Sequence, residues 1–481
     1  MSRRAKIFFT LLLVLGFLTR FIFMGYPNQV VFDETYFGKY ASYYETGNYF
    51  FDLHPPLGKM MLGVAAYVGH YTPNFAFNSI GNVYPDMSYI ILRLLPMILG
   101  SLMPCIIFLV ARQVGLSDEA SFFAGLLSTF ENSLVVQSRF ILIDIFIVFF
   151  GFLGLYFYLR YRKAVYKKFS IEKILLLIVS LVLFGCTLST KWTGLSFLGI
   201  AGLVELRDIY VRKNKTALLK TLSLFLIIPA AVYVLVFAAH FYLLPKSGPG
   251  DGFMSSAFNM TLAGSNAGDG QHIQPAEFWD KFGEANIVMY QVQDQPGLAH
   301  HPYQSLWYSW PFMIRPIYYW NDDSTGAKIY LLGNPLVYWL STLAVLLTAL
   351  FLSLRYFQKW MHRYKHSSLY KKLSADFTIF TTKKSRNIAG ILMLGFCANF
   401  LPFIGITRSM FVYHYFSGLL FACLILAMLC DQIGDRKNKI AVMTALTACI
   451  IVSFVYFAPL TYGIPLSKTA FAQRQWLPTW H

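Results

Sequence analysis

Long apolar runs separated by short polar segments make up most of this chain. A helix that crosses a membrane needs about 20 apolar residues, and this criterion predicts about eleven spans, four of them short or interrupted by polar residues. They lie near residues 7–26, 88–111, 119–137, 140–159, 173–190, 193–206, 218–244, 335–354, 389–406, 411–430 and 440–460. The pattern predicts an all-α polytopic integral membrane protein.

Two shorter patterns with helical spacing lie in the polar segment 27–87, after the first span. Apolar and aromatic residues recur there at three- and four-residue intervals. They are Phe37, Tyr40, Ala41 and Tyr44 in one pattern, and Leu57, Met60, Met61, Val64 and Val68 in the other. We expect two short amphipathic helices in the membrane interface, the second opened by Pro55 and Pro56.

The composition agrees with a membrane protein and argues against a nucleic-acid binder. The chain is 56% hydrophobic and only 13% charged, with a net charge of +17. If the amino terminus is cytoplasmic and every span crosses, 27 of the 40 basic residues fall in inside segments, as the distribution of Lys and Arg in membrane proteins requires. We therefore expect a multi-pass protein of the cell membrane with a cytoplasmic amino terminus and an outside carboxyl terminus.

This topology divides the chain into three regions. Residues 1–244 hold seven spans and the first outer loop 27–87, residues 245–334 form a large outer loop, and residues 335–481 hold four spans. The six cysteines show neither paired nor metal-ligand spacing, which favours packing over disulfides or zinc. We expect no metal and no cofactor.

Most unusual polar residues fall on the predicted outer face. The acids there are Asp33, Glu34 and Asp52, and the cations are Arg20, Lys59, Arg139, Lys191, Arg315 and Arg408. Transfer of a sugar from a polyprenyl phosphate to a hydroxyl needs this mixture. The leaving phosphate is already a stable anion that cations hold, and the attacking alcohol needs a carboxylate base as it loses its proton.

Several of these residues have a structural alternative. Asp33 and Glu34 could simply cap the first interfacial helix. Arg20 could pair with those acids or lie at the interface. Lys59, opposite the apolar stripe of its helix, could bind phosphate or be solvated.

Four further candidates lie at the outer ends of later spans. Arg139 and Asp144 are ionisable residues at the end of a long apolar run, which makes them functional candidates. Their separation does not suit a pair within one helix, so we expect separate partners. Arg408 and His414 lie together in an aromatic segment, where His414 could equally be a packing residue.

These residues also carry a family resemblance. The chain resembles the bacterial, polyprenyl-phosphate-dependent branch of the protein O-mannosyltransferase family. The matching stretches share an acidic, aromatic or basic signature and run over most of the chain. They are 32–39, 49–59, 138–144, 191–194, 307–310, 315–320, 333–335 and 408–416.

The resemblance implies a GT-C type glycosyltransferase fold and an inverting transfer of a sugar, in this family mannose, to a Ser/Thr hydroxyl of a protein. It implies that Asp33 is the base, that Glu34 helps to place the acceptor, and that residues 1–244 form the catalytic half. The expected ligands of the donor phosphate are Arg139, Lys59, Arg408 and His414. The expected supporting residues are Arg20, Asp52, His54 and Asp144.

The partners that follow are a polyprenyl-phosphate sugar, an acceptor protein or glycan and the lipid bilayer, with no nucleic acid. Members of this fold also act in pairs, so a homo- or heterodimer is compatible with the resemblance. One alternative is a GT-C transferase that modifies a cell-wall polymer or lipid-linked glycan, as aminoarabinose transferases do. A non-enzyme alternative is a transporter or lipid flippase, which should show related halves and polar residues near the middle of the membrane.

Overall fold

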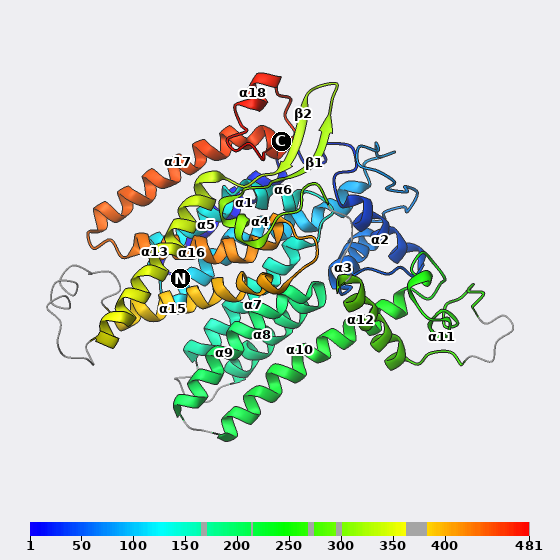
Figure 1. Cartoon of the computed structure of the whole chain (residues 1–481), viewed down its shortest axis with the longest axis horizontal. Coiled ribbons are helices and arrows are strands. Elements are labelled where there is room, and N and C mark those ends of the chain that lie inside the picture. The colour runs from blue at the N-terminus through cyan, green and yellow to red at the C-terminus, as the bar shows by residue number, and fades with distance from the viewer. Residues whose placement is uncertain (165–170, 213–214, 268–273, 295–300, 362–381, 481) are drawn as a thin grey trace.

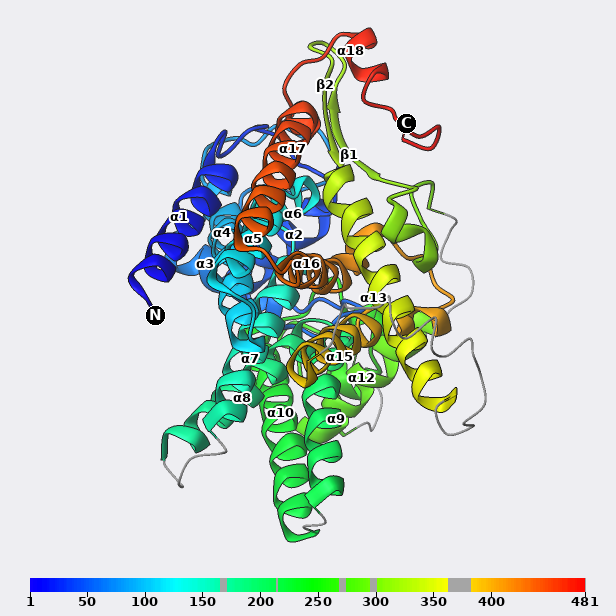
Figure 2. The ribbon, with the colours of Figure 1, turned by 90° about the vertical axis from the view of Figure 1, so that its left-hand side faces the viewer.

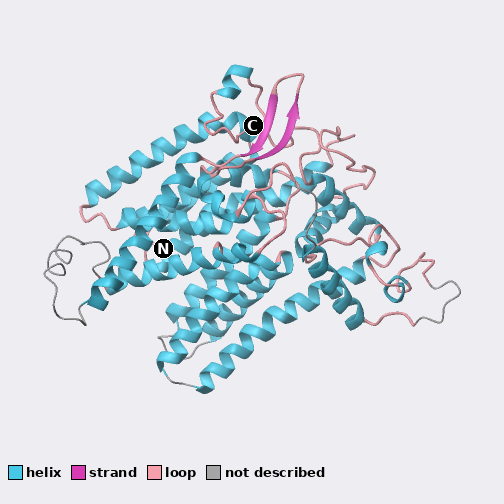
Figure 3. Cartoon of the chain, viewed as in Figure 1, coloured by secondary structure: helices cyan, strands magenta, loops and turns pink. Residues whose placement is uncertain are grey.

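The computed structural model describes residues 1–164, 171–212, 215–267, 274–294, 301–361 and 382–480, and these form a helical bundle with a loop-rich cap at one end (Figures 1 and 3). The long helices are α1 (Arg3–Phe21), α4 (Tyr89–Val114), α5 (Asp118–Thr129), α6 (Asn132–Arg139), α7 (Asp144–Ala164), α8 (Ile171–Thr190), α9 (Leu195–Arg212), α10 (Lys215–Leu243), α13 (Pro335–Met361), α15 (Lys383–Ala398), α16 (Phe416–Asp431) and α17 (Arg436–Tyr462). The all-α membrane fold is confirmed.

Each of the eleven predicted spans has a helical counterpart, but not all of them are single long helices. Among the described residues, eight helices are long and apolar enough to cross a membrane. The three other predicted spans correspond to α1, α9 and the pair α5–α6. The last of these is interrupted because α5 ends at Thr129, and the buried Glu131 then caps the new helix α6 by accepting hydrogen bonds from the backbone N–H groups of Ser133 and Leu134.

The helices differ in how deeply they lie in the bundle. Helices α4, α7 and α16 lie at its centre, and 61–78% of their apolar windows is buried. Helices α10 and α17 lie at the periphery, with 17% and 28% buried (Figure 2). Exposed apolar residues such as Leu226, Leu235 and Val452 on these outer helices suit contact with lipid.

Two short helices form in the first outer segment, as predicted: α2 (Glu34–Thr46) and α3 (Leu57–Val68). The face of α3 that packs inward differs from the expected apolar stripe. Its buried residues include Gly58, Lys59 and Gly63, whereas Val64 and Val68 are exposed. The alternative of a solvated Lys59 is therefore wrong, because the glycines allow close packing that brings this lysine inside.

The large outer loop contains structure that the sequence pattern did not predict. It includes α11 (Ser256–Asn259), α12 (Phe278–Asp294) and an antiparallel hairpin of β1 (Ile317–Asp322) and β2 (Ala327–Leu331), with a bulge between Tyr318 and Trp320. The hairpin packs against α6 and α17. A last short helix, α18 (Lys468–Ala472), lies beside the hairpin (Figure 1).

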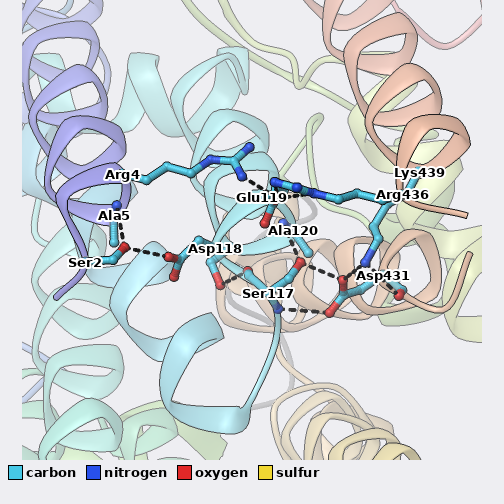
Figure 4. Close-up of polar contacts among 11 residues, drawn as sticks. Ser2, Arg4, Ala5, Ser117, Asp118, Glu119, Ala120, Asp431, Arg436 and Lys439 are labelled. Atoms are coloured by element: carbon cyan, nitrogen blue, oxygen red, sulfur yellow. Dashed lines mark hydrogen bonds and ion pairs between the residues drawn. The ribbon is translucent and has the colours of Figure 1, made fainter. Parts of the chain in front are cut away.

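Three of the segments that were predicted to lie inside are joined by polar contacts (Figure 4). Arg4 at the start of α1 and Arg436 at the start of α17 both bind Glu119 of α5. Ser117, just before α5, donates a hydrogen bond to Asp431 at the end of α16. These three segments thus share one end, as the predicted alternation of sides requires.

Candidate functional site

Asp33 lies at the start of α2, where the backbone turns sharply into the helix. The preceding Phe32 has φ 46°, a left-handed conformation that is rare for an aromatic residue, and its ring stacks on Tyr319 with centroids 4.1 Å apart. Asp33 holds the N-cap position, yet its side chain makes no capping hydrogen bond. The capping alternative is therefore wrong for Asp33.

The Asp33 carboxylate is the unpaired acid of the site. Within the described residues it accepts no hydrogen bond and forms no ion pair, although it is half-buried. Burial raises its pKa to about 7, Asp144 and Asp52 act in the same direction, and Lys191 opposes them. A carboxyl group with a pKa close to neutral is suited to accept a proton at physiological pH.

Glu34, the next residue, differs from Asp33 because both of its carboxylate oxygens accept hydrogen bonds. It is fully buried and accepts two hydrogen bonds from Arg93, both 2.7 Å, another from the Tyr84 hydroxyl and two from the backbone N–H groups of Val31 and Ile141. These contacts join the first outer segment to α4 and to the segment between α6 and α7. Glu34 thus fixes the backbone beside Asp33, and its proposed contact with the acceptor stays a prediction.

The two arginines expected near these acids lie elsewhere. Arg20 donates to the backbone oxygens of Ser128 and Thr129, so its predicted pairing with Asp33 and Glu34 is wrong. Arg139 is buried and donates to backbone oxygens, including those of Phe23 and Thr461.

Arg139 also packs against the ring of Tyr462 at 4.8 Å. The unpaired carbonyl oxygens at the ends of α1 and α17 attract this cation. Arg139 is therefore a structural cation in this conformation and does not line the cavity described below.

One ion pair of the site joins α3 to the segment that precedes it. The Lys59 ammonium group on α3 binds the Asp52 carboxylate and also donates to the backbone oxygen of His54 at 2.6 Å. Lys59 has only 1% of its side chain exposed. The pKa of His54 is held well below its usual value, chiefly by burial and then by Lys191 and Arg408, so this imidazole is neutral.

A second ion pair lies across the site on the ends of α7 and α8. Lys191 binds Asp144 at 2.6 Å, and the other oxygen of Asp144 accepts a hydrogen bond from the Gln137 amide at 2.9 Å. The Gln137 oxygen in turn accepts a hydrogen bond from the Tyr319 hydroxyl at 2.6 Å. The separate partners expected for Arg139 and Asp144 are confirmed, and the chain of contacts reaches from α8 to strand β1.

Arg408 and His414 approach this pair from the carboxyl-terminal half. Burial lowers the pKa of Arg408, and Tyr413, Asp52 and Asp144 act in the opposite direction. Within the described part of the chain Arg408 has no carboxylate within ion-pair distance. His414 stacks on Trp310 and its Nδ1 lies 3.0 Å from the Phe411 oxygen, so the packing interpretation also describes this residue.

A cavity of about 370 Å³ opens beside these charged groups. Its polar end is formed by Asp144, Lys191 and His414, and its walls continue along apolar residues of α9 and α15, including Leu203 and Ala398. Among the described residues, no three His, Cys, Asp or Glu side chains lie together as a metal site would require. The cavity can therefore hold an anionic group at one end and an apolar chain along its length.

Three functional residues were missed in the sequence or left out of the candidate set. Arg93, the partner of Glu34, is an arginine inside an apolar run, and this signal could have identified it. Lys191 was noted as an outer cation but not placed at the phosphate. Tyr319 lies in the matching stretch 315–320, but its contact with Gln137 was not predicted because the two residues are far apart in the sequence.

Two family models match the chain. The model described as dolichyl-phosphate-mannose-protein mannosyltransferase matches residues 10–245. The model described as the C-terminal four-helix membrane region of protein-O-mannosyltransferase matches residues 278–480. Together they cover most of the chain, while the division at residues 244 and 334 stays a prediction.

Curated relatives resemble part of the chain. A dolichyl-phosphate-mannose–protein mannosyltransferase 4 of Schizosaccharomyces pombe is 36% identical over 275 residues, which are 54% of this chain and 35% of the relative. Protein O-mannosyl-transferase 1 of Mus musculus is 35% identical over 265 residues, 53% of this chain and 36% of the relative. The matched region thus spans about a third of the length of these relatives.

Solved structures share the fold. One is a chain of the protein O-mannosyltransferase Pmt1–Pmt2 complex of S. cerevisiae, bound to the sugar donor. It superposes with a TM-score of 0.89 at 20% identity, covering 100% of this chain and 93% of that one. The oligosaccharyltransferase of Archaeoglobus fulgidus, at TM-score 0.53 and 13% identity, covers 98% and 55%. The fold is that of the GT-C glycosyltransferases, and the chain is a multi-pass membrane protein that belongs to the protein O-mannosyltransferase family.

Proposed function

We propose that this protein transfers mannose from a polyprenyl-phosphate carrier to a Ser or Thr hydroxyl of an acceptor protein. The observation that carries the proposal is the half-buried Asp33 carboxylate, which has no partner among the described residues and a pKa of about 7. The other acids of the site, Asp52 and Asp144, are each held by a lysine. An unpaired base for the alcohol nucleophile, with cationic side chains nearby for the phosphate leaving group, is the arrangement that this reaction requires.

In the proposed reaction, Asp33 accepts the proton of the acceptor hydroxyl as its oxygen attacks the anomeric carbon of the sugar. The new carbon–oxygen bond forms as the bond between that carbon and the phosphate oxygen breaks, and the carrier leaves as polyprenyl phosphate. A single displacement of this kind inverts the anomeric configuration. No covalent sugar–enzyme intermediate is needed, so one unpaired carboxylate suffices.

The donor phosphate would bind between Arg408 and Lys191, in place of Arg139. Arg408 has no carboxylate within ion-pair distance in the described residues, and its planar guanidinium group suits two phosphate oxygens. Lys191 contributes a second positive charge at the polar end of the 370 Å³ cavity. His54, which is neutral, and His414 can each offer an N–H donor.

The apolar part of the same cavity would hold the beginning of the polyprenyl chain. It is lined by residues of α7, α9, α15 and α16, helices that span the membrane or lie against the spanning bundle. A lipid-linked donor can then place its phosphate at the charged end without leaving the bilayer. Because the charged and apolar residues line one cavity, the site favours a lipid-borne donor over a soluble nucleotide sugar.

We further propose that the site faces the outside of a cell membrane and that the protein acts as a dimer. The orientation follows from the 27 basic residues predicted on the other side. The dimer is suggested by the yeast relative, which was solved as a Pmt1–Pmt2 complex. Light scattering of the purified protein would measure its oligomeric state.

The test is transfer of radiolabelled mannose from polyprenyl-phospho-mannose to a Ser/Thr-rich peptide by the purified protein in nanodiscs. The variant Asp33→Asn should abolish transfer, while Asp323→Asn, in an exposed turn of the hairpin, should keep it. Near-normal transfer by Asp33→Asn would refute Asp33 as the base. Consumption of the donor only with a glycan acceptor would redirect the proposal to polymer or glycan modification.

A further inference from the structure

A second cavity lies at the other end of the bundle from Asp33. Its volume is about 430 Å³. Helices α1 and α17 form its two walls and α5 forms its floor. The lining is mostly apolar, and includes Phe8, Phe122, Leu126, Met443, Thr447 and Ile451.

The cavity exists because α1 and α17 converge at one end only. Near the candidate site the Tyr462 hydroxyl of α17 donates a hydrogen bond to the Thr19 oxygen of α1 at 2.8 Å. Toward their amino-terminal ends both helices and α5 contribute residues to the lining of the cavity. The lining residues of α17 run from Ile440 to Ile451, a rise of about 16 Å. This length is about half the thickness of the hydrocarbon core, so the cavity has the depth of one leaflet.

The mouth of the cavity is positively charged. Arg4 from one wall and Arg436 from the other bind the same oxygen of Glu119, at 2.7 Å and 3.1 Å (Figure 4). Two guanidinium groups share one carboxylate, which leaves one positive charge uncompensated in this group. Both arginine side chains are exposed, at 42% and 68%, and a guanidinium group has five N–H donors.

We propose that this cavity is a binding site for one anionic phospholipid of the leaflet opposite the candidate site. An acyl chain occupies the apolar groove, and the phosphate binds Arg4 and Arg436 at its mouth. The uncompensated charge selects an anionic headgroup over a zwitterionic one.

The site would tie α1 to α17, the first and last long helices of the bundle, at the end where they do not touch. It is independent of the proposed sugar transfer, because it lies at the far end of the helices from the Asp33 site.

The test is lipid retention by the intact protein. The chain is reconstituted in vesicles of equal phosphatidylglycerol and phosphatidylcholine, re-extracted in mild detergent, and analysed by native mass spectrometry. We expect one phosphatidylglycerol per chain, retained at least fivefold over phosphatidylcholine. The double variant Arg4→Gln/Arg436→Gln should lose this preference, and Ala448→Trp, which fills the groove without changing charge, should lose the lipid.

The matched control is Lys437→Gln, which removes an exposed positive charge from the same turn as Arg436 and should bind as the wild type does. A monodisperse elution profile for every variant separates lipid loss from misfolding. Equal retention of the two lipids, or unchanged retention by Ala448→Trp, would overturn the proposal. So would a dimer that dissociates in Ala448→Trp, or displacement of phosphatidylglycerol by polyprenyl phosphate, because each identifies another occupant.

Discussion

Replacement of Asp33 by Asn should abolish transfer and at the same time stabilise the protein. The folded state raises the pKa of Asp33 from 3.8 to about 7, which means that folding disfavours the charged form. Asn cannot ionise, so the variant does not carry this cost above neutral pH. The loss of a general base should lower the rate about 10²- to 10⁴-fold.

The size of the stabilisation follows from the pKa. A rise of about three units corresponds to an upper limit of about 4 kcal/mol, at 1.36 kcal/mol per unit. Water that reaches the half-buried carboxylate screens it, so we expect about 1–2 kcal/mol at pH 8. A carboxyl group with a raised folded-state pKa makes the wild type lose stability as the pH rises from about 4 to about 7. The difference in stability between Asp33→Asn and the wild type should therefore increase from about pH 4 to about pH 7 and stay constant above pH 7.

The assay is the apparent unfolding midpoint in nanodiscs at one scan rate, measured from pH 4.5 to 8.5. At pH 8 the Asp33→Asn midpoint should exceed that of the wild type by about 1–3 °C. The matched variant is Asp144→Asn, which leaves Lys191 without its carboxylate partner and should destabilise the protein. A loss of stability in Asp33→Asn, or a difference that does not change with pH, would refute our account of this residue.

Other predictions concern the same site. The transfer rate of the wild type should rise with pH with a midpoint near 7 as Asp33 ionises, which a pH–rate profile measures; a flat profile would argue against a carboxylate base. Arg408→Gln should raise the KM for the donor about tenfold or more with little effect on peptide KM, which initial-rate kinetics separates. Arg93→Gln should destabilise the protein by about 3–5 kcal/mol because Glu34 stays buried without its cation, a loss that the unfolding midpoint reports. Tyr319→Phe should lower kcat several-fold but leave the unfolding midpoint within about 1–2 °C, because only one hydrogen bond is removed.

Much of the architecture could be predicted from the sequence because the membrane imposes simple rules. Apolar runs of sufficient length predicted all eleven helical positions, while the orientation inferred from the basic segments stays a prediction. The prediction of one span at 119–137 did not place the break between α5 and α6. The buried Glu131 that ends one helix and caps the next is invisible to a count of apolar residues.

The sequence predicted which residues approach the candidate site, but it did not predict which side chains contact one another there. Asp33, Asp52, His54, Lys59, Asp144 and Arg408 all approach one region. The pairing depends on contacts between segments that lie far apart in the chain, such as Glu34 with Arg93 or Lys191 with Asp144. Arg139 as a phosphate ligand stays a prediction: its residue type and position suit phosphate, whereas in the structure two helix ends supply carbonyl oxygens to it.

The contact between Tyr319 and Gln137 has a consequence for how the protein is made. Ribosomes deliver the chain from its amino terminus, so the seven predicted spans of residues 1–244 enter the membrane well before residue 319 is synthesised. Until strand β1 arrives, the Gln137 amide lacks the hydroxyl that orients it toward Asp144, and Phe32 lacks the ring on which it stacks. Under the proposed function, we therefore expect full activity only after the second half of the chain has folded onto the first.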